Sequence, residues 1–114
     1  MKYMLQVRFN GADAAIGSLP ADEQEKVTAE FGAIRRSPGV LDGNQLQAAS
    51  AGVTVRVSGG QPQVTKGPAV DAGAEVDGYY LYDAPDPDAA VAFAARIPIA
   101  RMGGTVEVRA MVER

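Results

Sequence analysis

Arginine, tyrosine and glutamate side chains are the groups of this chain that could do chemistry. Six of them lie in segments with the alternation of β-strands: Arg8, Arg56, Tyr80, Tyr82, Glu107 and Arg109. Guanidinium groups bind carboxylates and phosphates through paired hydrogen bonds, and tyrosine rings can wall the pocket around such a group. These residue types could therefore bind a small anionic ligand.

Residue types that are missing narrow the catalytic chemistry. The chain has no cysteine, which excludes disulfides, thiolate nucleophiles and thiolate-bound zinc. It has no histidine either, which removes the usual general base near neutral pH and the commonest metal ligand. We therefore assign no catalytic residue, no metal and no cofactor, and any catalysis would depend on carboxylates, Lys, Arg or Tyr.

Length and charge set the class of protein. With 114 residues, 46% apolar and 22% charged, the chain is expected to be one globular domain, residues 1–114. The net charge of -3 provides no basic surface for a phosphate backbone, so we expect no direct contact with nucleic acid. No apolar run reaches the ~18 residues that span a bilayer, and no signal peptide is evident. A cytoplasmic protein is expected.

The elements that must position these residues begin with a strand and a helix. Lys2 to Phe9 alternate between apolar and polar side chains, which is typical of a strand with one apolar face, and Asn10-Gly11 ends it. A helix follows Pro20, with acidic residues in its first turn, and ends at Ser37-Pro38-Gly39. Its expected apolar stripe is Val27, Phe31 and Ile34.

A weak strand and a hairpin come next. Val40 to Leu46 is expected to be a short strand interrupted by a turn at Asp42-Gly43-Asn44. Val53 to Val57 and Gln61 to Thr65 flank Gly59-Gly60, which predicts a β-hairpin. No helix start follows the two glycines, so they do not form a phosphate-binding loop.

The last part of the chain repeats the pattern of strand, helix and strand. Lys66 to Asp77 shows no hydrophobic period and is expected to be a loop, and Tyr79 to Tyr82 is the next strand. Asp86 caps a helix whose first residue is Pro87. The expected buried side of that helix is Val91, Ala94, Ala95 and Ile97, and the last strand runs from Thr105 to Val112.

This order predicts the fold class. Two strand-helix-strand units joined by an inserted hairpin are typical of a ferredoxin-like split β-α-β sheet in the α+β class. Both helices would then lie on one face of the sheet. The other face would present Met4, Gln6, Arg8, Arg56, Glu107 and Arg109, with Tyr80 and Tyr82 if Tyr79 and Leu81 point toward the helices. The first strand would lie between the third and the fourth, where Arg8 could meet Glu107 or Tyr82.

Two interpretations of this second face stay open. The same face of a second subunit could cover it and form a homodimer. Alternatively, part of the face stays open as a pocket in which the arginines hold an anionic group. A carboxylate pair is a weaker reading, because Glu107 is placed on the face whereas Asp83 lies at a strand end. Lys66 could act as a base only if it were desolvated.

Four segments together form a recognisable frame: Val64-Thr65-Lys66-Gly67-Pro68, Gly78-Tyr79-Tyr80-Leu81, Ala94 to Arg101 and Val106-Glu107-Val108-Arg109. This frame resembles the YCII-related family, in particular its DGPF branch. The resemblance implies a dimeric α+β barrel, in which two ferredoxin-like subunits pack sheet against sheet. Some wider relatives are small enzymes acting on lactones or chlorinated compounds with a His and an Asp, and the DGPF branch is linked to alternative sigma factors.

The chain departs from that branch in its signature loop. Lys66, Ala69, Asp71, Gly73 and Ala74 stand where the branch has Asp, Phe, Glu, Lys and Glu. Without His, the catalytic residues of the wider family cannot be transferred to this chain. We therefore expect a non-catalytic or small-anion-binding accessory homodimer resembling DGPF proteins tied to sigma-factor regulation. The alternative is a small isomerase or lyase in which Tyr80 or Tyr82 and the arginines stabilise an enolate-like anion.

Overall fold

The computed structural model describes residues 1–9, 11–71 and 74–113. The strands are β1 (Lys2–Arg8), β2 (Val40–Gln45), β3 (Val53–Ser58), β4 (Gln61–Lys66), β5 (Val76–Asp83) and β6 (Thr105–Ala110). The helices are α1 (Ala12–Gly17), α2 (Ala21–Arg35) and α3 (Pro87–Ala94), with short 3-10 turns at Ala49–Ala51 and Pro98–Arg101. Asn10 of the expected break and Gly73 of the signature loop lie outside the described residues.

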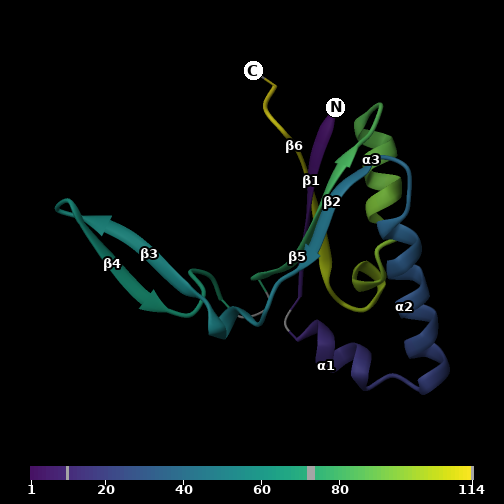
Figure 1. Cartoon of the computed structure of the whole chain (residues 1–114), viewed down its shortest axis with the longest axis horizontal. Coiled ribbons are helices and arrows are strands. Elements are labelled where there is room, and N and C mark those ends of the chain that lie inside the picture. The colour runs from purple at the N-terminus through teal and green to yellow at the C-terminus, as the bar shows by residue number, and fades with distance from the viewer. Residues whose placement is uncertain (10, 72–73, 114) are drawn as a thin grey trace.

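The main sheet has four antiparallel strands in the order β2-β5-β1-β6. β1 lies between β5 and β6, and Leu5 pairs with Tyr80 on one side and with Val108 on the other. Figure 1 shows α2 and α3 together on one side of this sheet. The ferredoxin-like arrangement expected from the order of the elements is confirmed.

The core lies between the sheet and these helices. Every second residue of β1, namely Tyr3, Leu5 and Val7, is buried, as its alternation predicts. Ile34 is buried in the core and the half-buried Phe31 packs against it, while Val27 is buried outside this cluster, so the predicted stripe is the buried side of α2. The core is therefore built from the elements that the hydrophobic period indicates.

The structure corrects half of the buried side expected for the last helix: Ala94 and Ile97 are buried as predicted, whereas Val91 and Ala95 are not. Ala90, Phe93 and Ala94 are the buried residues of α3, whereas Val91 is 56% exposed and Ala95 is exposed. The Phe93 ring stacks on Tyr82 with 4.0 Å between ring centroids. Exposing a phenylalanine ring to water costs more free energy than exposing a valine side chain. The helix therefore turns Phe93 inward and Val91 outward. α1 was not expected from the sequence at all.

The expected turn at Asp42-Gly43-Asn44 is also wrong. These residues continue β2, with one irregularity between Val40 and Asp42, and Gly43 pairs with Tyr80. A Cβ atom on Gly43 would lie 2.5 Å from Cδ1 of the Tyr80 ring. The glycine is therefore present because an aromatic ring crosses the strand at this residue and leaves no room for a side chain.

The inserted hairpin forms a separate two-stranded sheet, which we call the arm (residues 53–66). Gly59 and Gly60 have φ of 58° and 78°, the left-handed conformation that a tight hairpin turn requires. The expected loop at 66–77 is shorter than predicted, because β4 reaches Lys66 and β5 begins at Val76. The last strand ends at Ala110, and Val112 beyond it is 76% exposed.

Candidate functional site

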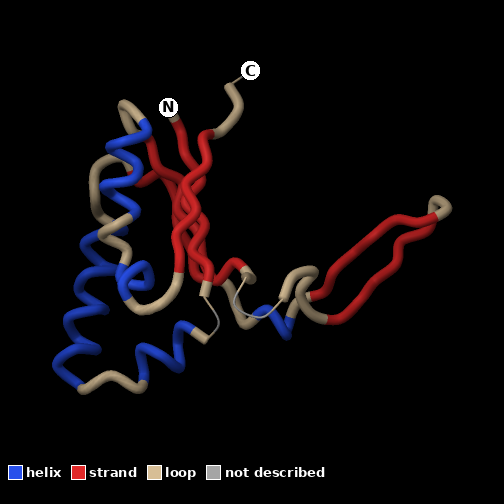
Figure 2. The backbone as a smooth tube through the Cα atoms, turned by 180° about the vertical axis from the view of Figure 1, so that it is seen from behind, coloured by secondary structure: helices blue, strands red, loops and turns tan. Residues whose placement is uncertain are grey.

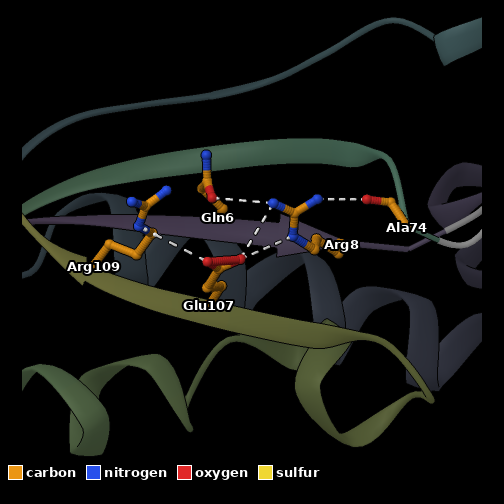
Figure 3. Close-up of polar contacts among 5 residues, drawn as sticks. All are labelled: Gln6, Arg8, Ala74, Glu107 and Arg109. Atoms are coloured by element: carbon orange, nitrogen blue, oxygen red, sulfur yellow. Dashed lines mark hydrogen bonds and ion pairs between the residues drawn. The ribbon is translucent and has the colours of Figure 1, made fainter. Parts of the chain in front are cut away.

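Three of the six expected site residues gather on the face of the sheet that the helices leave uncovered, which we call the open face. Arg8 and Glu107 form an ion pair at 3.2 Å between Nη2 and Oε2, and Nε of Arg8 also donates to Oε2 at 3.2 Å. Nε of Arg109 lies 3.9 Å from Oε1 of Glu107. Figure 3 shows the Glu107 carboxylate between the two guanidinium groups.

The register of β1 and β6 brings these side chains together. Gln6 pairs with Glu107 and Met4 with Arg109, so alternate residues of both strands point away from the helices. The Arg8 guanidinium also donates to Oε1 of Gln6 at 3.3 Å and to the Ala74 carbonyl. Of the two partners expected for Arg8, Glu107 is confirmed, whereas Tyr82 pairs with Tyr3. Because its donors are largely engaged within the chain, Arg8 is held in place more than it is offered to a ligand.

Tyr80 and Tyr82 do not lie on the open face, contrary to the expectation. They pair with Leu5 and Tyr3, which are buried beneath the helices, so both tyrosine rings point to the helix side. Tyr79 and Leu81 point to the open face instead. There the Tyr79 hydroxyl donates to Oδ2 of Asp42 at 2.9 Å and accepts from Nδ2 of Asn44 at 3.1 Å.

Arg56 does not join the other two arginines either. It lies in β3, where it pairs with Gln63 of the arm, away from the main sheet (Figure 1). The predicted cluster of three arginines therefore does not form within one chain. Asp83, the second carboxylate considered, pairs with the amino terminus at 3.3 Å and not with Glu107. Lys66 is exposed at the end of β4, so the burial that a base at this residue would need is not observed.

A cavity of about 480 Å³ lies on the helix side of the sheet, between α1, α2, β2 and β5. Apolar side chains of Val7, Ile16, Phe31 and Ile99 line part of it. Polar and charged residues complete the lining: Thr28, Arg35, Asn44, Gln45, Asp77, Tyr79 and Tyr80. Sequence reasoning missed this cavity, because Tyr80 was assigned to the opposite face and α1 was not foreseen.

Tyr80 is the cavity residue whose chemistry is most altered. Burial raises the pKa of its hydroxyl, and the positive charge of Arg35 opposes the rise in part. The hydroxyl is therefore protonated at neutral pH. It is also available as a hydrogen-bond donor, because it makes no hydrogen bond to the part of the chain that is described. Arg35 donates from Nη2 to the Gly43 carbonyl, which keeps its guanidinium beside β2.

Among residues 1–9, 11–71 and 74–113, no group of three or more Asp or Glu side chains comes close enough to hold a metal ion. None of the described helices is both long and apolar enough to cross a membrane.

Known proteins share this sequence pattern and this fold. The YCII-related domain matches residues 1–113 of the chain. A search of the curated proteins gave no match. Among solved structures, 5-chloro-2-hydroxyhydroquinone dehydrochlorinase from Burkholderia phenoliruptrix AC1100, in complex with 2,5-dihydroxybenzoquinone, is similar over 100% of this chain and 96% of its own, with a TM-score of 0.51 and 12% identity. At that identity the likeness shows a common fold.

Proposed function

The chain belongs to the YCII-related family, and from this premise we propose that it is a non-catalytic accessory protein that binds a small anionic ligand in the cavity on the helix side. The observation that carries the proposal is the cavity itself: about 480 Å³, with a partly apolar lining that also includes Tyr80 and Arg35. Ligand sites in proteins typically combine an apolar lining with a few polar groups that fix the ligand's orientation.

Tyr80 and Arg35 together suit one class of ligand. A protonated Tyr80 hydroxyl donates a hydrogen bond, and the Arg35 guanidinium adds a positive charge near it. Both favour an oxygen atom that carries negative charge, such as a carboxylate or a phenolate. The apolar lining favours a ring or short hydrocarbon body attached to that oxygen. The similar dehydrochlorinase is in complex with a flat, oxygen-bearing ring of this kind, which supports the choice of ligand class.

The proposal includes an assembly and a location. We place the protein in the cytoplasm as a homodimer joined through the open face, where Met4, Tyr79 and Leu81 are half-buried apolar side chains. The frame Val64 to Pro68 supports membership of the DGPF branch. A tie to sigma-factor regulation stays a prediction that rests on the resemblance alone.

The second candidate function is a small enzyme of the isomerase or lyase type. The position of Tyr80 favours it, because a protonated hydroxyl beside a guanidinium could stabilise an enolate-like anion in a transition state. Tyr82 is not suited to this role, since its ring stacks on Phe93 in the core.

An NMR titration with 2,5-dihydroxybenzoquinone, benzoate and inorganic phosphate tests the proposal. We expect the ring-bearing anions to bind the wild type and Tyr80→Phe to weaken them about ten-fold, the worth of one hydrogen bond. Tyr82→Phe is the matched control, since it removes a tyrosine hydroxyl from the same side of the same strand, at a residue outside the lining of the cavity. If none of the three probes shifts the resonances of cavity residues, the site is rejected. An equal loss of affinity in both variants would also reject it. Turnover of a bound probe would select the enzyme.

A further inference from the structure

The arm presents an apolar face that nothing in the described chain covers. Val53, Val55, Val57 and Val64 are 57–71% exposed. The register pairs Val55 with Val64 and Val57 with Pro62, so these side chains share one face, and the other face is polar. A two-stranded hairpin alone is at best marginally stable in water. Its regular pattern of valines therefore indicates a surface that is covered when the protein is assembled.

The position of the arm indicates which side of the molecule its partner occupies. Figures 1 and 2 show the arm leaving the body on the side of the sheet opposite to α2 and α3, which is the side of the open face. The arm makes the molecule extended: its radius of gyration is 15.9 Å, against about 13 Å for a compact domain of this length. The arm projects beyond the open face, so a partner protein bound to the open face would lie alongside the arm.

Charge favours a second copy of the same chain as that partner. Arg56 and Lys66 are the charged residues of 53–66, so the arm carries +2. The remaining residues hold nine basic and fourteen acidic side chains and carry -5. A basic arm is thus attracted to the acidic body of another copy. A two-fold arrangement would let each arm flank the other body, which makes the contact reciprocal and closed.

The dimensions agree with this arrangement. Six residues of extended strand reach about 20 Å. Packed sheets lie about 10 Å apart, so an arm of that length passes the sheet of a copy on the open face and reaches its helix layer. We infer that the arm clasps a second copy seated on the open face and that its valine face packs against that copy. The inference rests on the proposed sheet-face dimer.

Thiol reactivity tests the clasp, since the chain has no cysteine of its own. V64C places a single thiol on the valine face in the middle of β4, and Q63C places one on the polar face at the neighbouring residue. Each variant is reacted with a maleimide in native buffer and in denaturant, and its mass in solution is measured by light scattering. In the native dimer we expect the V64C thiol to react at least about ten-fold more slowly than the Q63C thiol, with equal rates in denaturant.

A third substitution on the open face separates the clasp from the dimer. In the V64C background, Leu81→Glu should yield monomers in which protection is lost, and diluting V64C alone should give the same loss. A dimer whose two thiols react equally would overturn the clasp and leave the sheet-face dimer standing. A monomer at every concentration would overturn both. Protection that persists in the monomer would show the arm folded onto its own body and would also overturn the clasp. The ligand titration with the Tyr80 variant tests the cavity on the helix side, so its result is independent of the thiol-reactivity and mass measurements.

Discussion

At the scale of single residues, the position of Tyr80 organises the candidate site. Its ring crosses Gly43 on the neighbouring strand, and Tyr80 lines the same cavity as Arg35. The glycine and the tyrosine therefore form one unit, in which the absent side chain of one residue makes room for the ring of the other. A side chain at Gly43, which also lines the cavity, would displace the Tyr80 ring and with it the proposed ligand donor.

Gly43→Ala should destabilise the fold. The added Cβ would lie 2.5 Å from Cδ1 of Tyr80 and 3.3 Å from the Tyr79 carbonyl oxygen, so the ring or the strand must move. Overpacking of this kind costs about 1–3 kcal/mol of unfolding free energy, measured by urea denaturation. Gly17→Ala is the control, because a Cβ there meets nothing within 4 Å. Equal stability of the two variants would contradict the close approach of Tyr80 to β2.

At the scale of elements, α3 shows how one large ring determines the phase of a helix. Asp86 accepts a hydrogen bond from the Ala89 amide at 2.8 Å and Pro87 occupies the first turn, so the start of the helix is fixed locally. Its rotation is not fixed locally, because alanines are small enough to fit on either side. Stacking of Phe93 on Tyr82 selects the rotation that is observed.

Phe93→Ala and Val91→Ala should therefore differ widely in stability. Phe93 is 4% exposed, and its truncation leaves a cavity beside Tyr82, which costs about 3–5 kcal/mol. Val91 is 56% exposed, and its truncation should change stability by less than about 0.5 kcal/mol. Thermal and urea unfolding of both variants provide the comparison. If the two variants lost comparable stability, Val91 would belong to the buried side of α3, as the sequence alone suggested.

At the scale of the whole molecule, contacts distant in sequence join the two halves of the chain. Arg101 binds Glu30 through two hydrogen bonds of 2.7 Å, which tie the 3-10 turn before β6 to α2. The Arg101 hydrogen bond holds the pKa of the Glu30 carboxyl below its ordinary value near 4.5. A carboxyl whose pKa is lowered by folding stabilises the folded state above its unfolded pKa, and that stability is lost as the pH falls through the folded pKa.

Glu30→Gln should consequently lower stability at neutral pH and not in acid. Both partners remain partly exposed, so the loss at pH 7 should not exceed about 1 kcal/mol. The deficit should begin to shrink below the ordinary value of 4.5 and vanish once Glu30 of the wild type is protonated. Urea unfolding from pH 7 to pH 3 measures it. Glu25→Gln is the control, at an exposed site of α2 without an ion pair among the described residues, and should show a smaller deficit. If the deficit of Glu30→Gln did not change with pH, the ion pair with Arg101 would not be its cause.

The sequence alone determined the order of the strands and of the two longer helices and the topology of the sheet, with Glu107 as one of two expected partners of Arg8. These features depend on short-range signals: alternation in β1, the Asp86 cap with Pro87, and the two glycines of the hairpin turn. Such signals act between neighbouring residues and can be read without knowing what packs above them. The missed helix α1 and the false turn at Asp42 lie where these signals are weak.

Only the tertiary structure decided which face of β5 is buried and where the arm lies. Tyr79 with Leu81 and Tyr80 with Tyr82 are alternating pairs of similar hydrophobicity, so periodicity could not choose between them. Pairing with the buried Leu5 and Tyr3 made the choice, moved two site residues to the helix side and created the cavity there. Arg56 was separated from Arg8 because the hairpin pairs with itself and not with the main sheet. Alternation states which side chains share a face, whereas contacts between distant strands state what that face meets.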